Sequence, residues 1–242
     1  MGERLDTALV TRGLCSTRNR AKTSIAEGSV TVNGLVCMKP SQSVSDEDVL
    51  NVTQPLPFVG RGGLKLAFAL SEFRLSVAGL SCLDIGASTG GFTDCMLQNG
   101  AKHVLAVDVG HDQLAPELRA DARVTALDGM DIRNLPPDTE GLPAEFAACD
   151  ASFISLKHIL PVLPPLLSDH AKAVMLVKPQ FEAGRSAIGK NGIVRDAKVR
   201  AKVLREIRDA AAAVGLLPLA ECESPVKGGS GNTEFLLLLE KQ

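Results

Sequence analysis

Short apolar runs alternate with amphipathic segments from residue 81 to the end of the chain. The apolar runs predict a short buried strand that begins at residue 81 and further strands at 103–107, 123–126, 146–149, 173–177, 216–220 and 235–239. Between them, apolar residues at helical spacing predict helices at 91–99, 155–167 (interrupted by Pro161) and 197–214. This alternation predicts an α/β fold built on a doubly wound, mainly parallel sheet with helices on both faces. Ligands of such sheets bind at the carboxyl ends of the strands, where the strand order reverses.

The first fifty residues follow a different and more closely spaced pattern. Two short helices are expected within residues 4–28, the second capped by Ser16, and each ends at a glycine. Apolar and hydroxyl residues then alternate ahead of Asn33-Gly34, a strong hairpin signal, and a last strand is expected at 49–52. The segment is therefore expected to form a compact α+β module with a thin core.

Two prolines within residues 54–60 deny this stretch regular structure. We therefore expect a small domain at 1–53, a linker at 54–60 and a larger domain at 61–242. The larger domain is expected to open with a helix that begins near Arg61.

Composition limits the classes of protein that this chain can represent. Hydrophobic residues make up 45% of the 242 positions, but without Trp or Tyr and with only eight Phe the core must be mainly aliphatic. The formal net charge of −2 argues against a uniformly basic nucleic-acid binder, so any such contact must come from local patches.

The six cysteines stand at positions 15, 37, 82, 95, 149 and 222 and include no Cys-x-x-Cys pair. This pattern predicts reduced thiols rather than a disulfide framework or a metal site. The N-terminus has no apolar signal segment, and no run approaches the ~20 apolar residues that span a bilayer. We therefore expect a soluble, cytoplasmic protein without a metal.

Two local basic clusters interrupt the near-neutral charge. Arg12, Arg18, Arg20 and Lys22 follow one another with no acidic residue between them, and residues 185–205 hold seven basic residues and one acid. Either cluster could contact phosphates. The alternatives are a solvated helix face for the first and a mobile lid for the second.

Residues 81–93 predict a buried strand, a glycine-rich turn and a helix start, with three glycines within six residues. Glycine lets the backbone approach a ligand closely, and the free N–H groups of the next helix point to the same place. A nucleotide-like cofactor is the natural ligand. Ser88 stands where a dinucleotide fingerprint needs its second glycine, and Asp84 suits a cofactor with a cationic amino-acid part.

Acidic residues follow the next two strands of this domain. Asp108 ends the second strand, about twenty residues after the glycine turn, where a carboxylate can accept both hydroxyls of a ribose. Asp128, Met130 and Asp131 follow the third strand, where an adenine would lie. One of the two carboxylates could accept from the exocyclic amine while Met130 covers the ring, and Asp131 is the preferred candidate.

Charged residues also mark the ends of later strands. Asp150 follows the fourth strand, Lys178 follows the fifth and Glu234 opens the last. Because neighbouring strand ends converge, these three side chains are expected to form one polar cluster beside the cofactor. Lys65 lies in the first turn of its predicted helix, where a cation is mildly unfavourable, and this local conflict hints at function.

The N-terminal module resembles, over residues 3–52, the small RNA-binding fold that is named after a protein of the small ribosomal subunit and also occurs in pseudouridine synthases. The resemblance rests on Arg4-Leu-Asp, Ser16-x-Arg18, Ala21-x-x-x-Ile25 and Gly28-x-Val30-x-Val32-Asn33-Gly34. It implies that the helical pair and the following turn contact structured RNA.

Nearly the whole chain resembles the TlyA family of ribosomal RNA 2′-O-methyltransferases, whose catalytic domain is of the FtsJ type and whose members are often labelled hemolysins. The motifs are Asp84-Ile-Gly-Ala-Ser-Thr-Gly-Gly-Phe-Thr, Asp150-Ala-Ser-Phe-Ile-Ser-Leu, Leu176-Val-Lys-Pro-Gln-Phe-Glu and Gly231-Asn-Thr-Glu. The resemblance implies a Rossmann-like methyltransferase sheet, S-adenosylmethionine as cofactor, and a cytidine ribose in 16S and/or 23S ribosomal RNA as target.

Residue roles follow from the resemblance and the patterns together. The implied catalytic tetrad is Lys65, Asp150, Lys178 and Glu234, in which Lys178 orients or deprotonates the hydroxyl, Asp150 and Glu234 hold that lysine, and Lys65 assists. Cofactor contacts are expected from Asp84, Gly86, Ala87, Ser88, Gly90, Gly91, Phe92, Asp108, Met130 and Asp131. RNA contacts are expected from Arg4, Arg12, Arg18, Arg20, Lys22, Arg61, Arg185 and Lys190.

Three rival classes make different demands on the sequence. A pore-forming hemolysin needs a secretion signal and membrane-active segments, which the sequence lacks. A non-catalytic RNA-binding or ribosome-assembly factor needs the basic patches but not the tetrad. A nicotinamide dehydrogenase is disfavoured by Ser88 in the glycine turn.

Overall fold

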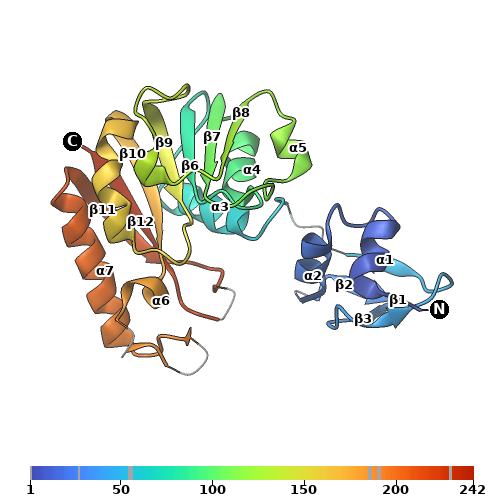
Figure 1. Cartoon of the computed structure of the whole chain (residues 1–242). Helices are drawn as coiled ribbons and strands as arrows, with labels where there is room; N and C mark the ends of the chain where they lie inside the picture. The colour runs from blue at the N-terminus through green and yellow to red at the C-terminus, as the bar shows by residue number, and fades with distance from the viewer. Residues whose placement is uncertain (1, 27, 54–56, 185–186, 190–191, 229–230) are drawn as a thin grey trace. The chain divides into compact units, whose positions relative to one another are not determined.

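The computed structural model describes residues 2–26, 28–53, 57–184, 187–189, 192–228 and 231–242 (Figure 1). The chain divides into two compact units, Met1–Arg61 and Gly62–Gln242.

The first unit packs two helices against short strands. The elements are α1 (Leu5–Thr11), α2 (Arg18–Ala26), β1 (Glu3–Arg4), β2 (Val30–Val32), β3 (Leu35–Val36), β4 (Ser43–Val44) and β5 (Leu50–Val52). The expected hairpin is β2–β3, whose turn residues Asn33 and Gly34 have φ of 52° and 81°, and β5 pairs on the other side of β2. Leu5, Leu9 and Ile25 are fully buried in the core of this unit.

Two details of the first unit differ from expectation. The hydroxyl of Thr17, not that of Ser16, accepts a hydrogen bond from the backbone N–H of Arg20 (3.2 Å), and α2 begins directly after Thr17. The antiparallel pair β1–β4 was not predicted, because two-residue strands are too short to show an alternating pattern.

The second unit is built on a seven-stranded sheet of order β11-β12-β10-β9-β6-β7-β8. Its strands are β6 (Ser81–Ile85), β7 (His103–Asp108), β8 (Val124–Asp128), β9 (Ala144–Cys149), β10 (Leu167–Val177), β11 (Leu216–Glu223) and β12 (Phe235–Lys241). Neighbours from β10 to β8 run parallel, and β12 runs antiparallel to both β10 and β11. The mainly parallel sheet is thus confirmed, and its order reverses between β6 and β9.

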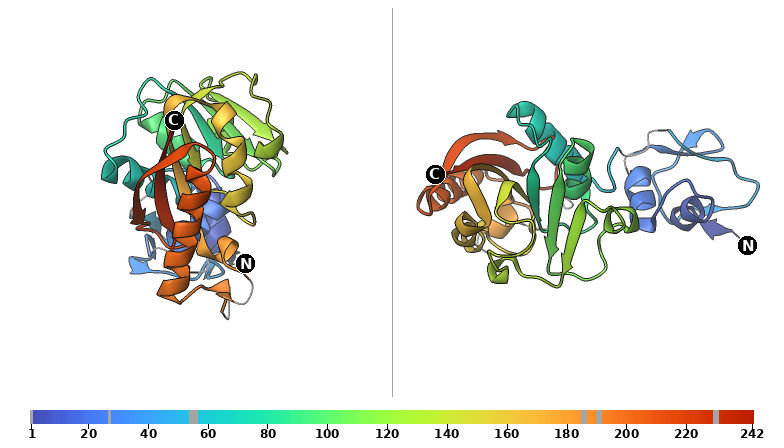
Figure 2. Two further views of the ribbon diagram at one scale, coloured as in Figure 1. Left: turned by 90° about the vertical axis from the view of Figure 1, so that its left-hand side faces the viewer. Right: turned by 90° about the horizontal axis from the view of Figure 1, so that it is seen from above.

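Helical layers cover both faces of this sheet (Figure 2). Leu83 and Ile85 belong to the core cluster that includes Val203 and Ile207 of α7 (Ala197–Ala212), whereas Asp84 between them bonds to Thr93 of α4 (Gly91–Gln98). Since successive strand residues point to opposite faces, α7 and α4 lie on opposite sides of the sheet. Helix α3 (Gly62–Glu72) packs beside α4.

The prediction of a helix at 155–167 is wrong. This segment forms three single-turn 3₁₀ helices, η2 (Leu156–His158), η3 (Leu160–Val162) and η4 (Pro164–Leu166), and β10 already begins at Leu167. Prolines lie in the first turns of η3 and η4, where their missing N–H groups prevent one continuous α-helix.

The short elements α5 (Pro116–Arg119), η1 (Ile132–Asn134) and α6 (Pro179–Glu182) were not predicted, since one turn carries no periodicity. No helix in the described part of the chain has the length and apolar character needed to cross a bilayer. All six cysteines are free thiols.

Candidate active site

The glycine turn joins β6 to α4 through a run of left-handed backbone angles. Gly86, Ser88 and Gly90 have φ of 79°, 47° and 95°. A β-carbon at position 86 would lie 3.0 Å from the Cα of Ala151 and 3.1 Å from the carbonyl oxygen of Asp150. Only glycine therefore lets the turn pack directly on the chain that leaves β9.

Asp84 lies beneath this turn rather than in an open pocket. Its side chain is fully buried; Oδ2 accepts a hydrogen bond from Thr93 Oγ1 (2.6 Å), and Oδ1 has no hydrogen-bond partner among the described residues. Burial raises the pKa of Asp84 to about 7. The carboxylate that sequence analysis assigned to the cofactor is thus a buried acid with one unsatisfied oxygen.

Asp84 makes the stability of the ligand-free protein depend on pH. Its ordinary pKa is 3.8, so between about pH 4 and 7 the folded protein holds a proton that the unfolded chain has lost. The contribution of Asp84 to stability therefore falls as pH rises through this range. Asp84→Asn keeps an acceptor for Thr93, and its melting temperature is expected to match wild type near pH 4 and exceed it at pH 8. A difference between the two proteins that is the same at both pH values would contradict this account.

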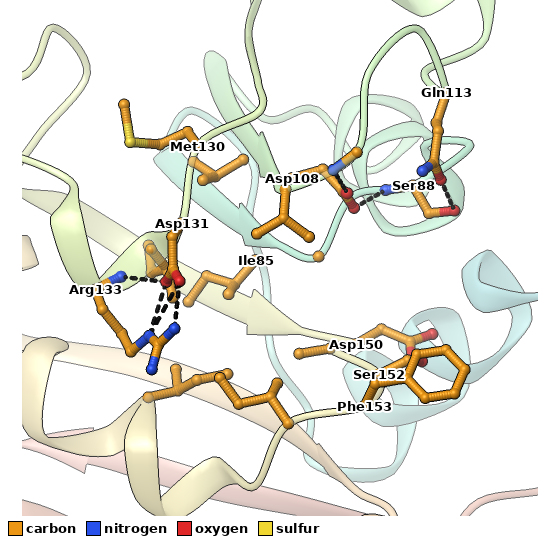
Figure 3. A pocket seen from close by; sticks show the side chains of 18 residues that line it. Ile85, Ser88, Asp108, Gln113, Met130, Asp131, Arg133, Asp150, Ser152 and Phe153 are labelled. Atoms are coloured by element: carbon orange, nitrogen blue, oxygen red, sulfur yellow. Dashed lines mark hydrogen bonds and ion pairs between the residues drawn. The ribbon is translucent and has the colours of Figure 1, made fainter.

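A cavity of about 790 Å³ opens at the carboxyl ends of β6, β7 and β9 (Figure 3). Asp108, at the end of β7, lines it with both oxygens fixed by the backbone. Oδ2 accepts from the N–H of Ser88 (2.8 Å) and Oδ1 from that of Gly110 (2.7 Å). Each oxygen keeps a further lone pair, so the carboxylate can accept from a pair of neighbouring hydroxyls.

The two carboxylates considered for an adenine lie in different places. Asp131 lines the cavity with Met130, and its pKa is lowered by the guanidinium of Arg133, whose Nε lies 3.0 Å from Oδ1. Asp128 instead pairs with Arg119 at 2.6 Å and is absent from the cavity lining in the described part of the chain.

The other residues expected at the cofactor split into two groups. Gly86 and Ser88 line the cavity, whereas Ala87, Gly90, Gly91 and Phe92 are missing from its lining as far as the chain is described. These four build the turn and the start of α4. At Gly90, for example, a β-carbon would lie 2.3 Å from Leu118 Cδ1, which packs against the turn.

The three charged residues at strand ends come together on adjacent strands β9, β10 and β12. Lys178 Nζ lies 2.6 Å from Asp150 Oδ1 and donates to Ser152 Oγ at 2.7 Å. Its distance to the Asp150 carbonyl oxygen is 3.5 Å. Asp150 also lines the cavity, so this pair stands at the cavity wall.

Glu234 has a different partner from the one expected. Its Oε2 lies 2.6 Å from Lys65 Nζ and its Oε1 accepts from Gln180 Nε2 at 3.3 Å. Lys65 and Glu234 are both buried, so the site holds two lysine–carboxylate pairs, Lys178–Asp150 and Lys65–Glu234, rather than one lysine between two carboxylates.

Helix α3 brings Lys65 to this cluster through a glycine start. A β-carbon on Gly62 would lie 3.4 Å from the Phe92 ring and 3.5 Å from Asp150 Oδ2. The first turn of α3 therefore packs against α4 and the Asp150 carboxylate, which explains a lysine in a helical turn that disfavours cations.

Sequence reasoning missed an aromatic pair beside Lys178. Phe153 lines the cavity, has a left-handed φ of 63° and is 91% exposed. Its ring centroid lies 5.1 Å from that of Phe181, and Lys178 Nζ lies 5.8 Å from the Phe181 centroid. The available signal was position, since Phe153 follows Asp150 by three residues and Phe181, in α6, follows Lys178 by three.

The expected RNA-contacting residues of the first unit keep much of their charge at the surface. Arg4 and Arg18 both bind the buried Asp6, at 3.0 and 3.1 Å, with about half of each side chain exposed. Arg12 donates to the backbone carbonyls of Asp48 and Ser45.

Lys22 and Arg61 are exposed, and Arg20 is partly buried. Arg185 and Lys190 lie outside the described residues. Farther along the second basic cluster, Lys198 and Arg205 are exposed on α7.

Two protein-family models match the chain, and their matched ranges correspond closely to its two units. A model of the FtsJ-like methyltransferase family matches residues 58–241, and a model of the S4 domain matches residues 3–50. The 16S/23S rRNA (cytidine-2′-O)-methyltransferase TlyA of Mycobacterium tuberculosis is 43% identical over 241 residues, covering 99% of this chain and 90% of that protein.

Two further relatives cover a similar extent. A Bacillus subtilis protein provisionally named the rRNA methyltransferase YqxC is 51% identical over 240 residues, covering 98% of this chain and 85% of that protein. The solved structure of a Streptococcus thermophilus protein provisionally named a hemolysin is 48% identical, with a TM-score of 0.80, and covers 100% of this chain and 89% of that one.

Proposed function

Because the chain belongs to the FtsJ-like methyltransferase family and carries an S4 domain ahead of the catalytic unit, we propose that it methylates a ribose 2′-hydroxyl, that of a cytidine, in ribosomal RNA. The methyl donor is S-adenosylmethionine. The observation that carries the proposal is the two lysine–carboxylate contacts, Lys178–Asp150, whose Asp150 lines the cavity, and the buried Lys65–Glu234.

The residues around the cavity fit S-adenosylmethionine. Asp108 offers two fixed acceptors for a ribose diol, and Met130 with Asp131 offers a surface and an acceptor for adenine. Asp84 is buried beneath the turn and outside the described lining of the cavity, so its proposed part is to support the turn that holds the cofactor. When bound, this cofactor supplies a methyl group on a positively charged sulfur.

Lys178 is proposed to orient the acceptor hydroxyl. The adjacent carboxylate of Asp150 holds the Lys178 ammonium in place at 2.6 Å, where the ammonium can donate a hydrogen bond and stabilise the charge that develops on the acceptor oxygen. Ser152 Oγ occupies one donor position of Lys178 from an exposed loop, so the acceptor hydroxyl can replace it. Lys65 and Glu234 fix the other side of the site.

Phe153 is proposed as the surface on which the target nucleobase stacks. Its ring lines the cavity and is 91% exposed, so a base can stack on it, and aromatic stacking stabilises a base by ~1–3 kcal/mol. Phe153→Ala is expected to raise the KM for RNA about tenfold and leave the Kd of S-adenosylmethionine unchanged. Phe153→Tyr, which keeps the ring, is the matched control. Equal effects of the two substitutions would contradict stacking.

The S4 domain and the exposed cations of α7 are proposed to recognise the RNA. In the first unit, Asp6 holds Arg4 and Arg18 with their outer halves in solvent, where they can contact phosphates. Because the proposed substrate is ribosomal RNA, we propose that the protein acts in the cytoplasm. Either or both ribosomal subunits can be the target.

The proposal is tested by incubating the purified protein with S-adenosylmethionine, labelled on its methyl group, and 16S or 23S ribosomal RNA, free or in subunits. The expected result is label on a cytidine 2′-oxygen, and the same position should lose its 2′-O-methyl group in cells that lack the protein. RNA binding without methyl transfer on any of these substrates would favour a non-catalytic assembly factor.

A further inference from the structure

A buried asparagine joins the segment ahead of α7 to the segment ahead of β12. Asn232 is 1% exposed; its Oδ1 accepts from the N–H of Val194 (3.0 Å), and its Nδ2 donates to the carbonyl of Gly192 (3.0 Å). Both polar atoms of this side chain are thus used on one short stretch that lies 38 to 40 positions earlier in the chain.

One side of this contact leads to Glu234. The backbone carbonyl of Asn232 accepts a hydrogen bond from the N–H of Gly228 at 2.9 Å. A β-carbon on Gly228 would lie 2.3 Å from Glu234 Oε1. The carboxylate of Glu234 therefore packs against Gly228, the residue that bonds to the Asn232 backbone. Glu234 in turn binds Lys65.

The other side of the contact leads to exposed cations. Val194 is 1% exposed, whereas Arg195 directly after it and Lys198 in the first turn of α7 are exposed. Arg200 reinforces the segment, since its Nη1 donates to the carbonyls of Val194 (3.2 Å) and Arg195 (2.7 Å). Asn232 therefore joins the segment that carries the exposed cations to the segment that packs against Glu234.

We propose that Asn232 is a positioning residue that fixes the RNA-facing cations Arg195 and Lys198 in register with the Lys65–Glu234 pair. The inference rests on the proposed function, because it assigns RNA phosphates as the ligands of Arg195 and Lys198. Phosphate contacts hold the register of a nucleic acid on a protein. Through its contacts with both segments, Asn232 fixes the position of the bound RNA relative to the acceptor side of the site. The cavity for the methyl donor does not depend on Asn232.

A double-mutant cycle separates this role from ordinary structural support. Asn232→Ala is made in the wild-type protein and in an Arg195→Ala/Lys198→Ala background, and KM for ribosomal RNA, kcat and the Kd of S-adenosylmethionine are measured. Ser224→Ala is the matched control, since within the described residues this buried hydroxyl bonds only to Val226: it donates to the Val226 carbonyl and accepts from the Val226 N–H.

In the wild-type protein, Asn232→Ala is expected to raise KM and lower kcat, each about tenfold, as loss of a buried donor and acceptor implies. In the background without Arg195 and Lys198, Asn232→Ala should raise KM less than about twofold, because the two cations that Asn232 positions are no longer there. The Kd of S-adenosylmethionine should stay within about twofold throughout. Asn232→Asp, which still accepts from Val194 but cannot donate to Gly192, should give intermediate values.

An equal rise in KM in both backgrounds, or the same effect from Ser224→Ala, would overturn the proposal. Failure of the proposed function is a separate result: the wild-type protein would then transfer no methyl group to any ribosomal RNA. In that case RNA affinity, measured by filter binding across the same variants, still tests whether Asn232 acts through Arg195 and Lys198.

Discussion

Lys178→Ala is expected to lower kcat for methyl transfer by about 10³-fold while S-adenosylmethionine binds as tightly as to the wild-type protein. The size follows from the loss of a charge-stabilising donor at the acceptor oxygen. Binding of the donor should persist because Lys178 is absent from the lining of the cavity in the described chain, where Asp108 and Asp131 provide the polar contacts. The Lys178 ammonium pairs with Asp150, donates to Ser152 and lies 5.8 Å from the centroid of the Phe181 ring.

The measurement is single-turnover methyl transfer together with calorimetric titration of the cofactor. Lys157→Ala is the control, since this lysine is exposed and pairs with Glu206 on the surface. Near-normal transfer by Lys178→Ala would remove Lys178 from the mechanism. Loss of cofactor binding would show that the substitution disturbs the cavity rather than the acceptor.

The Lys65–Glu234 pair is expected to separate stability from activity. Both side chains are at least nine-tenths buried, so Lys65→Met or Glu234→Leu alone leaves an unpaired buried charge. Each single substitution is expected to lower the free energy of unfolding by ~3–5 kcal/mol, and the double substitution is expected to restore it. Methyl transfer should be lost in all three variants, because none of them keeps the lysine–carboxylate pair that helps to orient the RNA hydroxyl.

Urea unfolding and methyl transfer on the same four proteins give the result. The surface pair Lys157–Glu206 is the matched control, for which either single substitution should change the unfolding free energy by less than ~1 kcal/mol. A stable double variant that methylates RNA at the wild-type rate would mean that Lys65 and Glu234 serve the fold alone.

The sequence predicts the sheet well because most of its strands, β6, β7, β9, β10 and β12, are largely buried apolar runs. The convergence of Asp150, Lys178 and Glu234 also follows from the sequence, since β9, β10 and β12 are neighbours in the sheet. Which lysine pairs with which carboxylate cannot be predicted from the sequence. The pairing depends on where α3 packs, which is set by the close approach of Gly62 to Phe92 and Asp150, a tertiary contact with no periodic signal.

Local rules failed where several short signals competed. Residues 155–167 show helical apolar spacing, but their prolines allow only single 3₁₀ turns. Ser16 and Thr17 are equally good capping types, and only the position of Arg20 N–H decides between them. The exposure of Phe153 could not be inferred from a motif in which it stands next to Ile154, because apolar residues are usually buried.

Gly86 gives the site a genetic vulnerability. Every missense change of a glycine codon adds a β-carbon, and at position 86 that atom would meet the Ala151 and Asp150 backbone at 3.0–3.1 Å, on a backbone whose φ of 79° already disfavours side chains. One nucleotide substitution therefore strains the turn above Asp84 and displaces the chain that carries Asp150 and Ser152. Loss-of-function alleles should accordingly include changes at this codon, although the residue has no side chain with which to take part in the chemistry.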